Sequence, residues 1–262
     1  MIIRIGKIPY LNSEVFFTHL EFQDRLEMVP LVPSALSRAA LGGEIDAGPF
    51  PLVTCFDLAD RFKPLGDFCI ATRDKARSIL LFSKRPIENL SGASIAVTSE
   101  TSTSVRLLKV LLSKKIGVTP GGYVSTGDSN DAFLLIGDEA LRKRKGVPLY
   151  SHIYDLGEIW NEWTGLPFVF ARWGVREDVP GPIVTRFVGA LEKALAAGLG
   201  NIDEIAGRRG EDLGMTKKEV CEYIGGFRYT LGEAEKTVIE RFKELDTEVR
   251  ISEESKRASH LG

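Results

Sequence analysis

Predicted strands alternate with predicted helices along the first 175 residues of this 262-residue chain, and this alternation limits the fold more than any other feature. The expected strands are residues 2–6, 26–32, 45–48, 78–82, 93–98, 133–138 and 167–171. Alternation of this kind is typical of α/β proteins with mainly parallel sheets. In such open sheets ligands bind at the carboxyl ends of strands, so the loops that follow strands are the first place to look for a site.

The last third of the chain has a different character. After Pro180-Gly181-Pro182 the pattern predicts helices and no strong strand, which suggests that the chain returns to pack on its first half. The polar tail 252–262 is expected to be loose. The expected helices here are residues 183–198, 203–209, 216–224 and 232–249, and earlier ones are 13–24, 34–41 and 105–112.

Charge and hydropathy exclude several classes of partner. The chain has 34 Lys and Arg against 36 Asp and Glu, a formal net charge of −2, so it lacks the cationic excess that nucleic acid or an anionic membrane would require. No stretch approaches the roughly 20 apolar residues of a membrane span, and Arg4 interrupts the short apolar run at the start. We therefore expect a cytoplasmic protein with no nucleic-acid or membrane partner.

The cysteines and histidines argue against a metal centre. The three cysteines, Cys55, Cys69 and Cys221, form no C-x-x-C pair, and an odd number gives no disulfide framework. The histidines show no H-x-x-x-H or H-E-x-x-H spacing. We predict no bound metal and no cysteine–histidine catalysis.

The strongest local signal is a run of hydroxyl side chains between a predicted strand and a predicted helix. Thr101, Ser102 and Thr103 would lie at the helix N-terminus, where unpaired backbone N–H groups and the helix dipole attract a carboxylate or phosphate. Simple capping of the helix is the alternative. Because the chain has no Gly-rich loop ending in G-K-[ST], a small organic acid is the expected ligand rather than a nucleotide triphosphate.

Two further segments beside predicted strands could bind a substrate, one just after a strand and one at the start of a strand. Tyr10 and Asn12 come after the first strand, and the Asn12 amide could orient a polar substrate or could merely cap the next helix. Arg77 stands beside Ser78 at the start of another strand, where the pair could bind a carboxylate, with a solvated charge run as the alternative.

Gly137 and Asp138 end a buried strand. Asp138 could serve as a catalytic acid or base, or could cap the helix that follows.

Taken in order, the motifs resemble the menaquinone-biosynthesis family that contains chorismate dehydratase. No single motif decides this, but their order and spacing make the set specific. The matching segments are Arg4–Asn12, Gly43–Asp46 with Pro51, Ser78, Thr101–Val105, Leu134–Leu141, Asp155–Gly157, Thr164–Ala171 with Trp173, and Phe227–Tyr229.

The resemblance implies a fold like the type II periplasmic binding proteins, with two α/β lobes and a ligand cleft between them. Residues 1–88 and 175–262 would form one discontinuous lobe, and residues 89–174 would form the other. Hinges are expected near 86–92 and 171–176, and the lobes would close on a ligand. The chain would be a monomer or a homodimer.

The resemblance also implies a reaction that needs no cofactor. Chorismate, a small dicarboxylate, would lose water to give 3-[(1-carboxyvinyl)oxy]benzoate, the first step of the futalosine route to menaquinone. A sister enzyme, the dihydroxynaphthoate synthase, has His-Glu where this chain has Gly137-Asp138, which favours the dehydratase.

The residues fit that chemistry. Formation of an aromatic ring makes the loss of water favourable, so a site that only positions the substrate could supply much of the rate. Asn12 would orient the leaving hydroxyl, while Ser78 and Thr101–Thr103 would bind carboxylate. The proton acceptor stays open between Asp138, Glu14 and a carboxylate of the substrate itself.

Two segments, 48–52 and 68–78, depart from the family pattern. They keep open a paralogous enzyme, or a cytoplasmic solute-binding protein, for another small carboxylate.

Overall fold

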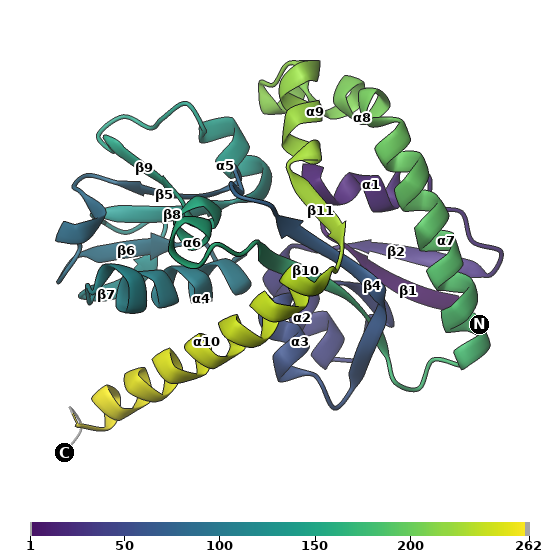
Figure 1. The fold of residues 1–262 in the computed structure, drawn as a ribbon, viewed down its shortest axis with the longest axis horizontal. Coiled ribbons are helices and arrows are strands. Elements are labelled where there is room, and N and C mark those ends of the chain that lie inside the picture. Colours follow the sequence, from purple (N-terminus) through teal and green to yellow (C-terminus); the bar gives the residue numbers. More distant parts are fainter. Residues whose placement is uncertain (1, 260–262) are drawn as a thin grey trace.

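The computed structural model describes residues 2–259 and shows two β-sheets side by side, each with helices packed on it (Figure 1). We call the part built on the six-stranded sheet the first lobe, and the part built on the five-stranded sheet the second lobe. The six-stranded sheet has the order β11-β4-β10-β3-β1-β2 and the five-stranded sheet the order β7-β6-β8-β5-β9. The first contains β1 Ile2–Lys7, β2 Arg25–Pro30, β3 Ala47–Pro51, β4 Phe62–Thr72, β10 Phe168–Arg176 and β11 Phe227–Thr230. The second contains β5 Ile79–Ser83, β6 Ser94–Val97, β7 Gly122–Ser125, β8 Ala132–Ile136 and β9 His152–Asp155.

Helices and helical turns connect these strands. The first lobe carries η1 Leu11–Ser13, α1 Glu14–Phe17, α2 Pro33–Leu41, α3 Leu52–Asp57, α7 Gly181–Gly200, α8 Ile202–Arg209, η4 Glu211–Leu213, α9 Lys217–Gly225 and α10 Glu233–Ser259. The second carries η2 Ile87–Asn89, α4 Thr103–Val110, the π-helical turn η3 Leu111–Ile116, α5 Gly137–Lys143 and α6 Leu156–Thr164. Helix α10 packs on α3 and β10 and reaches across to α4 of the second lobe.

The sheets are mixed, so the expectation of mainly parallel sheets was wrong. Strand β1 pairs in parallel with β2 and β3, and β6 pairs in parallel with β7 and β8. However, β10 runs antiparallel to both β3 and β4, and β5 runs antiparallel to both β8 and β9. Strand β5 is the first strand after the chain enters the second lobe, and β10 is the first strand after it returns to the first lobe. Each is reached without the helical crossover that makes neighbouring strands parallel, so each runs antiparallel to its neighbours.

The chain passes between the sheets earlier than expected at both crossings. Strand β5 pairs with β8, so residues 79–83 belong to the second lobe and not to the first, which was expected to run to residue 88. Strand β10 pairs with β3 and β4, so residues 168–174 belong to the first lobe. The connections are residues 73–78 and 165–167, not the expected hinge segments 86–92 and 171–176. A mostly apolar strand has the same sequence pattern in either sheet, so the pattern could not show which lobe holds β5 and β10.

Several local predictions also differ from the structure. The expected helix 13–24 ends at Phe17, and the Thr18 N–H and hydroxyl both donate to the Glu14 carbonyl at 2.9 Å. Strands β4, β7, β9 and β11 were not expected, and in β4 Pro64 and Gly66 read as loop residues. The tail is helical to residue 259, held in part by the Lys109–Glu253 ion pair at 2.8 Å, and residues 260–262 lie outside the described chain.

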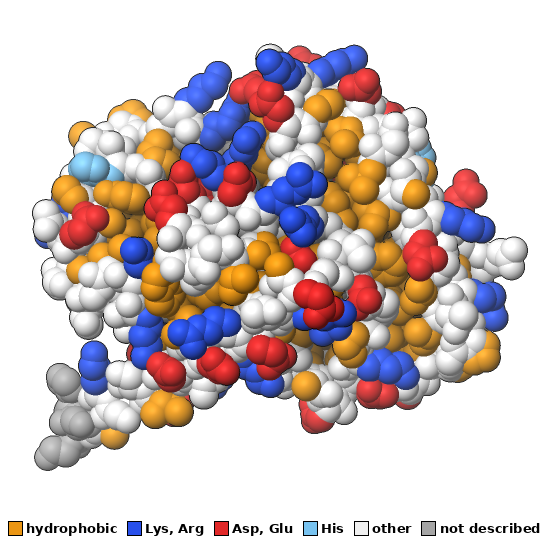
Figure 2. Space-filling model, viewed as in Figure 1, with side chains coloured by type: hydrophobic (Ala, Val, Ile, Leu, Met, Phe, Trp, Pro, Cys, Tyr) orange, Lys and Arg blue, Asp and Glu red, His pale blue; other side chains and the backbone are white. Residues whose placement is uncertain are grey.

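Acidic and basic side chains are interspersed over the face seen in Figure 2, with Lys and Arg gathered between α5 and α9. Among the described residues, no helix combines the length and apolar character needed to cross a bilayer.

Asp155 fixes the first connection between the lobes. Its carboxylate accepts hydrogen bonds from the N–H groups of Gly157 at 2.9 Å and Glu158 at 3.2 Å, which caps α6. It also accepts from Ala76 at 3.0 Å and Arg77 at 2.5 Å, in the segment that leads into β5. One side chain therefore satisfies four backbone donors and holds the crossing segment against the second lobe.

We expect Asp155→Ala to lower the free energy of unfolding by about 2–3 kcal/mol, because it removes a helix cap and leaves partly buried N–H groups unpaired. Denaturant unfolding of the two proteins measures this difference. Glu162→Ala, at an exposed position on the same helix, is the control and should change stability by less than about 0.5 kcal/mol. Equal effects of the two variants would contradict the role given to Asp155.

Candidate active site

A pocket lies between the two lobes, with walls from both. The space between its walls is about 550 Å³ including the part open to solvent, a size typical of small-molecule sites. The first lobe contributes Ile8, Tyr10, Asn12, Pro33, Pro51, Ile70, Phe170, Ala171 and Phe227. The second lobe contributes Ser78, Ile79, Ser102, Thr103, Ser104, Ile136 and Gly137. Of the residues predicted from sequence, the pocket brings together Tyr10, Asn12, Ser78, Ser102, Thr103 and Gly137.

The N-terminus of α4 forms one wall of this pocket. Ser102 is the N-cap residue but its side chain makes no capping hydrogen bond, so its hydroxyl is not used up by the helix. The first N–H groups of any α-helix lack intrahelical acceptors, and here Thr103 and Ser104 begin the helix at the pocket wall. The wall therefore presents hydroxyl and N–H donors together, which suits a carboxylate.

The loop after β1 forms the facing wall. Tyr10 and Asn12 both line the pocket, and the Tyr10 hydroxyl donates to Glu100 Oε2 at 2.8 Å across the cleft. Burial raises the pKa of Tyr10 well above its ordinary value, and the nearby Glu100 carboxylate raises it further, so the phenol stays protonated. The Asn12 side-chain amide has no hydrogen-bond partner among the described residues. It is left available to a ligand.

Gly137 lets these two walls approach each other. Its φ of +58° lies in the left-handed region, and a Cβ at this position would lie 2.7 Å from ring atoms of Tyr10. Its N–H donates to the Ser78 carbonyl at 2.8 Å. Only glycine meets both the backbone conformation and the close ring contact.

Ser78 is buried at the base of the second lobe's wall, where a neighbouring tyrosine orients it. The Tyr223 hydroxyl, from α9 of the first lobe, donates to Ser78 Oγ at 2.8 Å. Ser78 Oγ lies 3.3 Å from the Ala76 carbonyl, to which it can donate. Burial raises the pKa of Tyr223 well above its ordinary value, so it acts as a neutral donor.

Arg77 and Thr101 do not line the pocket, contrary to expectation. Arg77 is exposed, and its left-handed φ of 58° and its N–H bond to Asp155 belong to the crossing segment. Thr101 closes a turn, with its hydroxyl donating to the Thr98 carbonyl at 2.9 Å. In both cases local backbone geometry turns the side chain away while its sequence neighbour faces the ligand space.

Asp138 was expected to be catalytic, but it also lies outside the pocket lining and joins the two lobes instead. Its carboxylate accepts from the Leu11 N–H at 2.9 Å and pairs with Arg209 of α8. Burial raises the pKa of Asp138 above its usual range, while the Leu11 N–H and the Arg209 guanidinium oppose that shift. Since Leu11 precedes Asn12, the Asp138 carboxylate fixes the backbone that presents Asn12 to the pocket.

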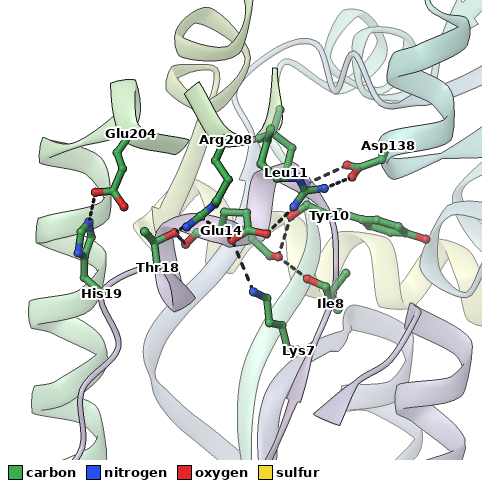
Figure 3. A network of polar contacts seen from close by, with 12 residues as sticks. Lys7, Ile8, Tyr10, Leu11, Glu14, Thr18, His19, Asp138, Glu204 and Arg208 are labelled. Atoms are coloured by element: carbon green, nitrogen blue, oxygen red, sulfur yellow. Dashed lines mark hydrogen bonds and ion pairs between the residues drawn. The ribbon is translucent and has the colours of Figure 1, made fainter. Parts of the chain in front are cut away.

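Glu14 belongs to the same polar network and likewise faces cations rather than the ligand space. It is buried, and Lys7 at 3.5 Å and Arg208 at 3.3 Å approach it (Figure 3). Arg209 bridges it to Asp138. The Glu14 carboxylate is thus engaged by three cations and does not line the pocket.

Sequence reasoning missed most of the apolar wall and one hydroxyl. Ser104 belongs to the same hydroxyl run but was not among the expected binding residues, and the structure places it at the pocket. Phe170 and Phe227 stand on β10 and β11, and nothing in an apolar strand distinguishes a wall of a cleft from a core position.

The pocket lining contains no Asp, Glu, His, Lys, Arg or Cys side chain among the described residues. Polar contacts must therefore come from hydroxyls, the Asn12 amide and backbone N–H groups. Such donors stabilise anions at fixed positions, and aromatic and aliphatic side chains supply the contacts for an apolar ring.

Comparison with known proteins identifies the family. The family model described as menaquinone biosynthesis matches residues 3–248. The chain belongs to this menaquinone-biosynthesis family. Within it, a protein named chorismate dehydratase from Thermus thermophilus is 33% identical over 232 residues, which cover 81% of this chain and 84% of that protein. The family resemblance read from the motifs is confirmed.

Solved structures confirm the fold expected of this menaquinone-biosynthesis protein. A crystal structure from Archaeoglobus fulgidus matches with a TM-score of 0.79 at 18% identity, covering 95% of this chain and 98% of that chain. A Candida albicans protein described as having the generic periplasmic binding protein fold matches with a TM-score of 0.60 at 10% identity, covering 96% and 90%. The periplasmic-binding-protein fold, with its pocket between lobes, is the one observed.

We expect Gly137→Ala to cost at least about 2 kcal/mol of stability, since it combines a left-handed φ with a clash against Tyr10. Gly127→Ala is the matched control, because Gly127 has no heavy atom within 4 Å of an added Cβ and no positive φ. Thermal and denaturant unfolding measure both variants. A fully stable Gly137→Ala protein would mean that the Tyr10–Gly137 contact does not shape the pocket.

Proposed function

We propose that this protein is a chorismate dehydratase, a hydro-lyase that removes water from chorismate to give 3-[(1-carboxyvinyl)oxy]benzoate for menaquinone synthesis. The observation that carries the proposal is a pocket between the lobes lined by neutral hydrogen-bond donors and apolar rings, in a chain 33% identical to a chorismate dehydratase. The futalosine route and a cytoplasmic location are part of this proposal. They are supported by the biosynthetic role in the family's description.

The substrate's two carboxylates match the two groups of donors. Ser102, Thr103 and Ser104 at the N-terminus of α4 would bind one carboxylate. Ser78 would bind the other by turning its proton from the Ala76 carbonyl to the ligand, while its oxygen still accepts from Tyr223. Ile70, Phe170 and Phe227 would pack on the ring, which leaves Asn12 to orient the departing hydroxyl. Donors held in place before the substrate arrives need no reorganisation during the reaction.

The proton acceptor is the remaining chemical question. Elimination breaks a ring C–H bond and the C–OH bond, and it leaves an aromatic ring and water. Of the three candidates from sequence, Asp138 and Glu14 are paired with cations outside the pocket lining. We therefore favour a carboxylate of the substrate as the acceptor, with the protein supplying position rather than a base.

Incubation of the purified protein with chorismate, followed by mass spectrometry and ultraviolet absorbance, tests the activity. We expect a product lighter by one water with an aromatic spectrum. Unchanged chorismate that still stabilises the protein against heat would indicate a binding protein. Unchanged chorismate with no stabilisation would show that the pocket takes a different acid.

We expect Asn12→Asp and Ser78→Ala each to lower kcat/KM for chorismate by about 10²-fold, comparable to the loss of one preorganised donor in other active sites. The Asp variant also places a negative charge beside the substrate anions. Ser113→Ala, at an exposed position on η3, is the control and should keep full activity. Asn12→Asp with full turnover would exclude the role given to Asn12.

Asp138→Asn distinguishes a positioning residue from a base. We expect kcat/KM to fall by about tenfold while the shape of the pH–rate profile is unchanged, because the variant disturbs Asn12 without removing a proton acceptor. The adjacent exposed Glu139→Gln is the matched control. Loss of a limb of the profile in Asp138→Asn alone would instead assign the base to Asp138.

A further inference from the structure

A second cavity lies within the first lobe, away from the pocket between the lobes. The space between its walls is about 860 Å³ including the part open to solvent. Its apolar walls come from β3, β4, α3 and α10. Unlike the first pocket, it is also lined by charged residues. The apolar residues include Phe50, Leu52, Phe56, Leu58, Phe62 and Ile239, and the charged ones are Lys63, Arg172, Glu177, Glu240 and Lys243.

Arg172 is the unusual member of this lining. It is half-buried on β10, and its Nε is fully buried without a hydrogen-bond partner among the described residues. Its guanidinium also forms no ion pair in this part of the chain. A buried Nε that donates to nothing is costly, so the arrangement fits an anion that binds from outside.

Neither acidic residue of the lining, Glu177 or Glu240, forms an ion pair with Arg172 in the described part of the chain. Glu177, at the rim, faces Lys63 at 3.5 Å, and Glu235, on the neighbouring part of α10, faces Arg228 at 3.3 Å. The Cys55 thiol lies 3.8 Å from the Arg172 carbonyl, and burial raises the pKa of Cys55 to about 12. The thiol is therefore neutral at physiological pH and supplies no counter-charge.

The two cavities share a pair of strands. In the antiparallel pairing of β10 with β3, Ala171 lies opposite Pro51, and both line the first pocket. The next pair along, Arg172 opposite Phe50, lines the second cavity. The two cavities therefore meet at adjacent residue pairs of one two-stranded ribbon, formed by β3 and β10.

We propose that the second cavity binds a small organic anion with an apolar body, whose carboxylate or similar group pairs with Arg172 while its apolar part packs against Phe50, Phe56 and Phe62. The lining carries Lys63, Arg172 and Lys243 against Glu177 and Glu240, so its net charge is positive and favours an anion. A guanidinium matches a carboxylate with two parallel hydrogen bonds, whereas the apolar walls favour an aromatic or aliphatic acid over phosphate.

An occupant would also act on the first pocket through the shared ribbon. Phe50 contacts Phe62 edge to face at 4.9 Å between ring centres, and it packs closely on the β10 backbone at Gly174. A ligand that shifts Phe50 therefore shifts the strand that carries Pro51. This effect on turnover rests on the proposed function, whereas binding itself does not.

The binding test uses 4-fluorobenzoate as the probe, followed by fluorine NMR, with uncharged 4-fluorobenzamide as its matched control. We expect 4-fluorobenzoate to bind the wild-type protein at least tenfold more tightly than 4-fluorobenzamide. Arg172→Gln should weaken 4-fluorobenzoate by at least tenfold, since a charge-assisted pair is lost. Ser78→Ala, which alters only the first pocket, should leave the affinity unchanged.

If Arg172→Gln folds poorly, two further variants still test whether the probe binds in the second cavity. Arg172→Lys keeps the charge but not the paired donors, so its affinity should be intermediate. Ala59→Phe obstructs the rim from an exposed position, so it should weaken the probe without loss of stability. In a separate measurement, saturating 4-fluorobenzoate should change turnover of chorismate in wild-type protein but not in Ala59→Phe.

Three results would overturn the proposal. One is no binding of 4-fluorobenzoate to the wild-type protein, and another is equal affinity in folded Arg172→Gln. The third is complete displacement by chorismate together with weakening by Ser78→Ala, which would place the probe in the first pocket. If chorismate is not turned over at all, the proposed function fails but the binding comparison still decides the second site.

Discussion

The contact made by Asp138 across the cleft is the one on which the site depends. A single carboxylate on α5 of the second lobe holds the Leu11 N–H and the Arg209 guanidinium of the first lobe. Without it, the loop after β1 would keep the Tyr10–Glu100 bond to the opposite lobe, but the Leu11 backbone that presents Asn12 would lose its anchor. A buried charge of this kind contributes little to net stability, but it specifies one arrangement of the lobes.

Other hydrogen bonds across the cleft also hold the two lobes together. Tyr10 reaches Glu100, Tyr223 reaches Ser78, and the Ser34 hydroxyl donates to the Ser99 carbonyl at 2.6 Å. All these partners come from opposite lobes, so separating the lobes would break them together. The structure is therefore that of a closed cleft, in which low local polarity strengthens each hydrogen bond to a bound anion.

Sequence patterns predicted the α/β class and the helical last third, and six of the named residues line the pocket. Hydroxyls at a helix start and a glycine after a strand can be recognised from the local sequence. The patterns could not decide which sheet β5 and β10 join, since both strands are mostly apolar and such a pattern fits either sheet. They also could not separate Arg77 from Ser78 or Asp138 from Gly137. In each pair the residues are adjacent, and only the backbone path decides which one faces the pocket.

The uncharged lining of the first pocket has a consequence for how this scaffold changes over time. A site built on arginine or lysine must keep each cation matched to an anion, so a change of substrate leaves a buried charge without a partner. Here a hydroxyl can move, appear or vanish at the cost of a single neutral hydrogen bond. Related chains can therefore take up acids of different shape by small steps, each of which leaves a folded protein.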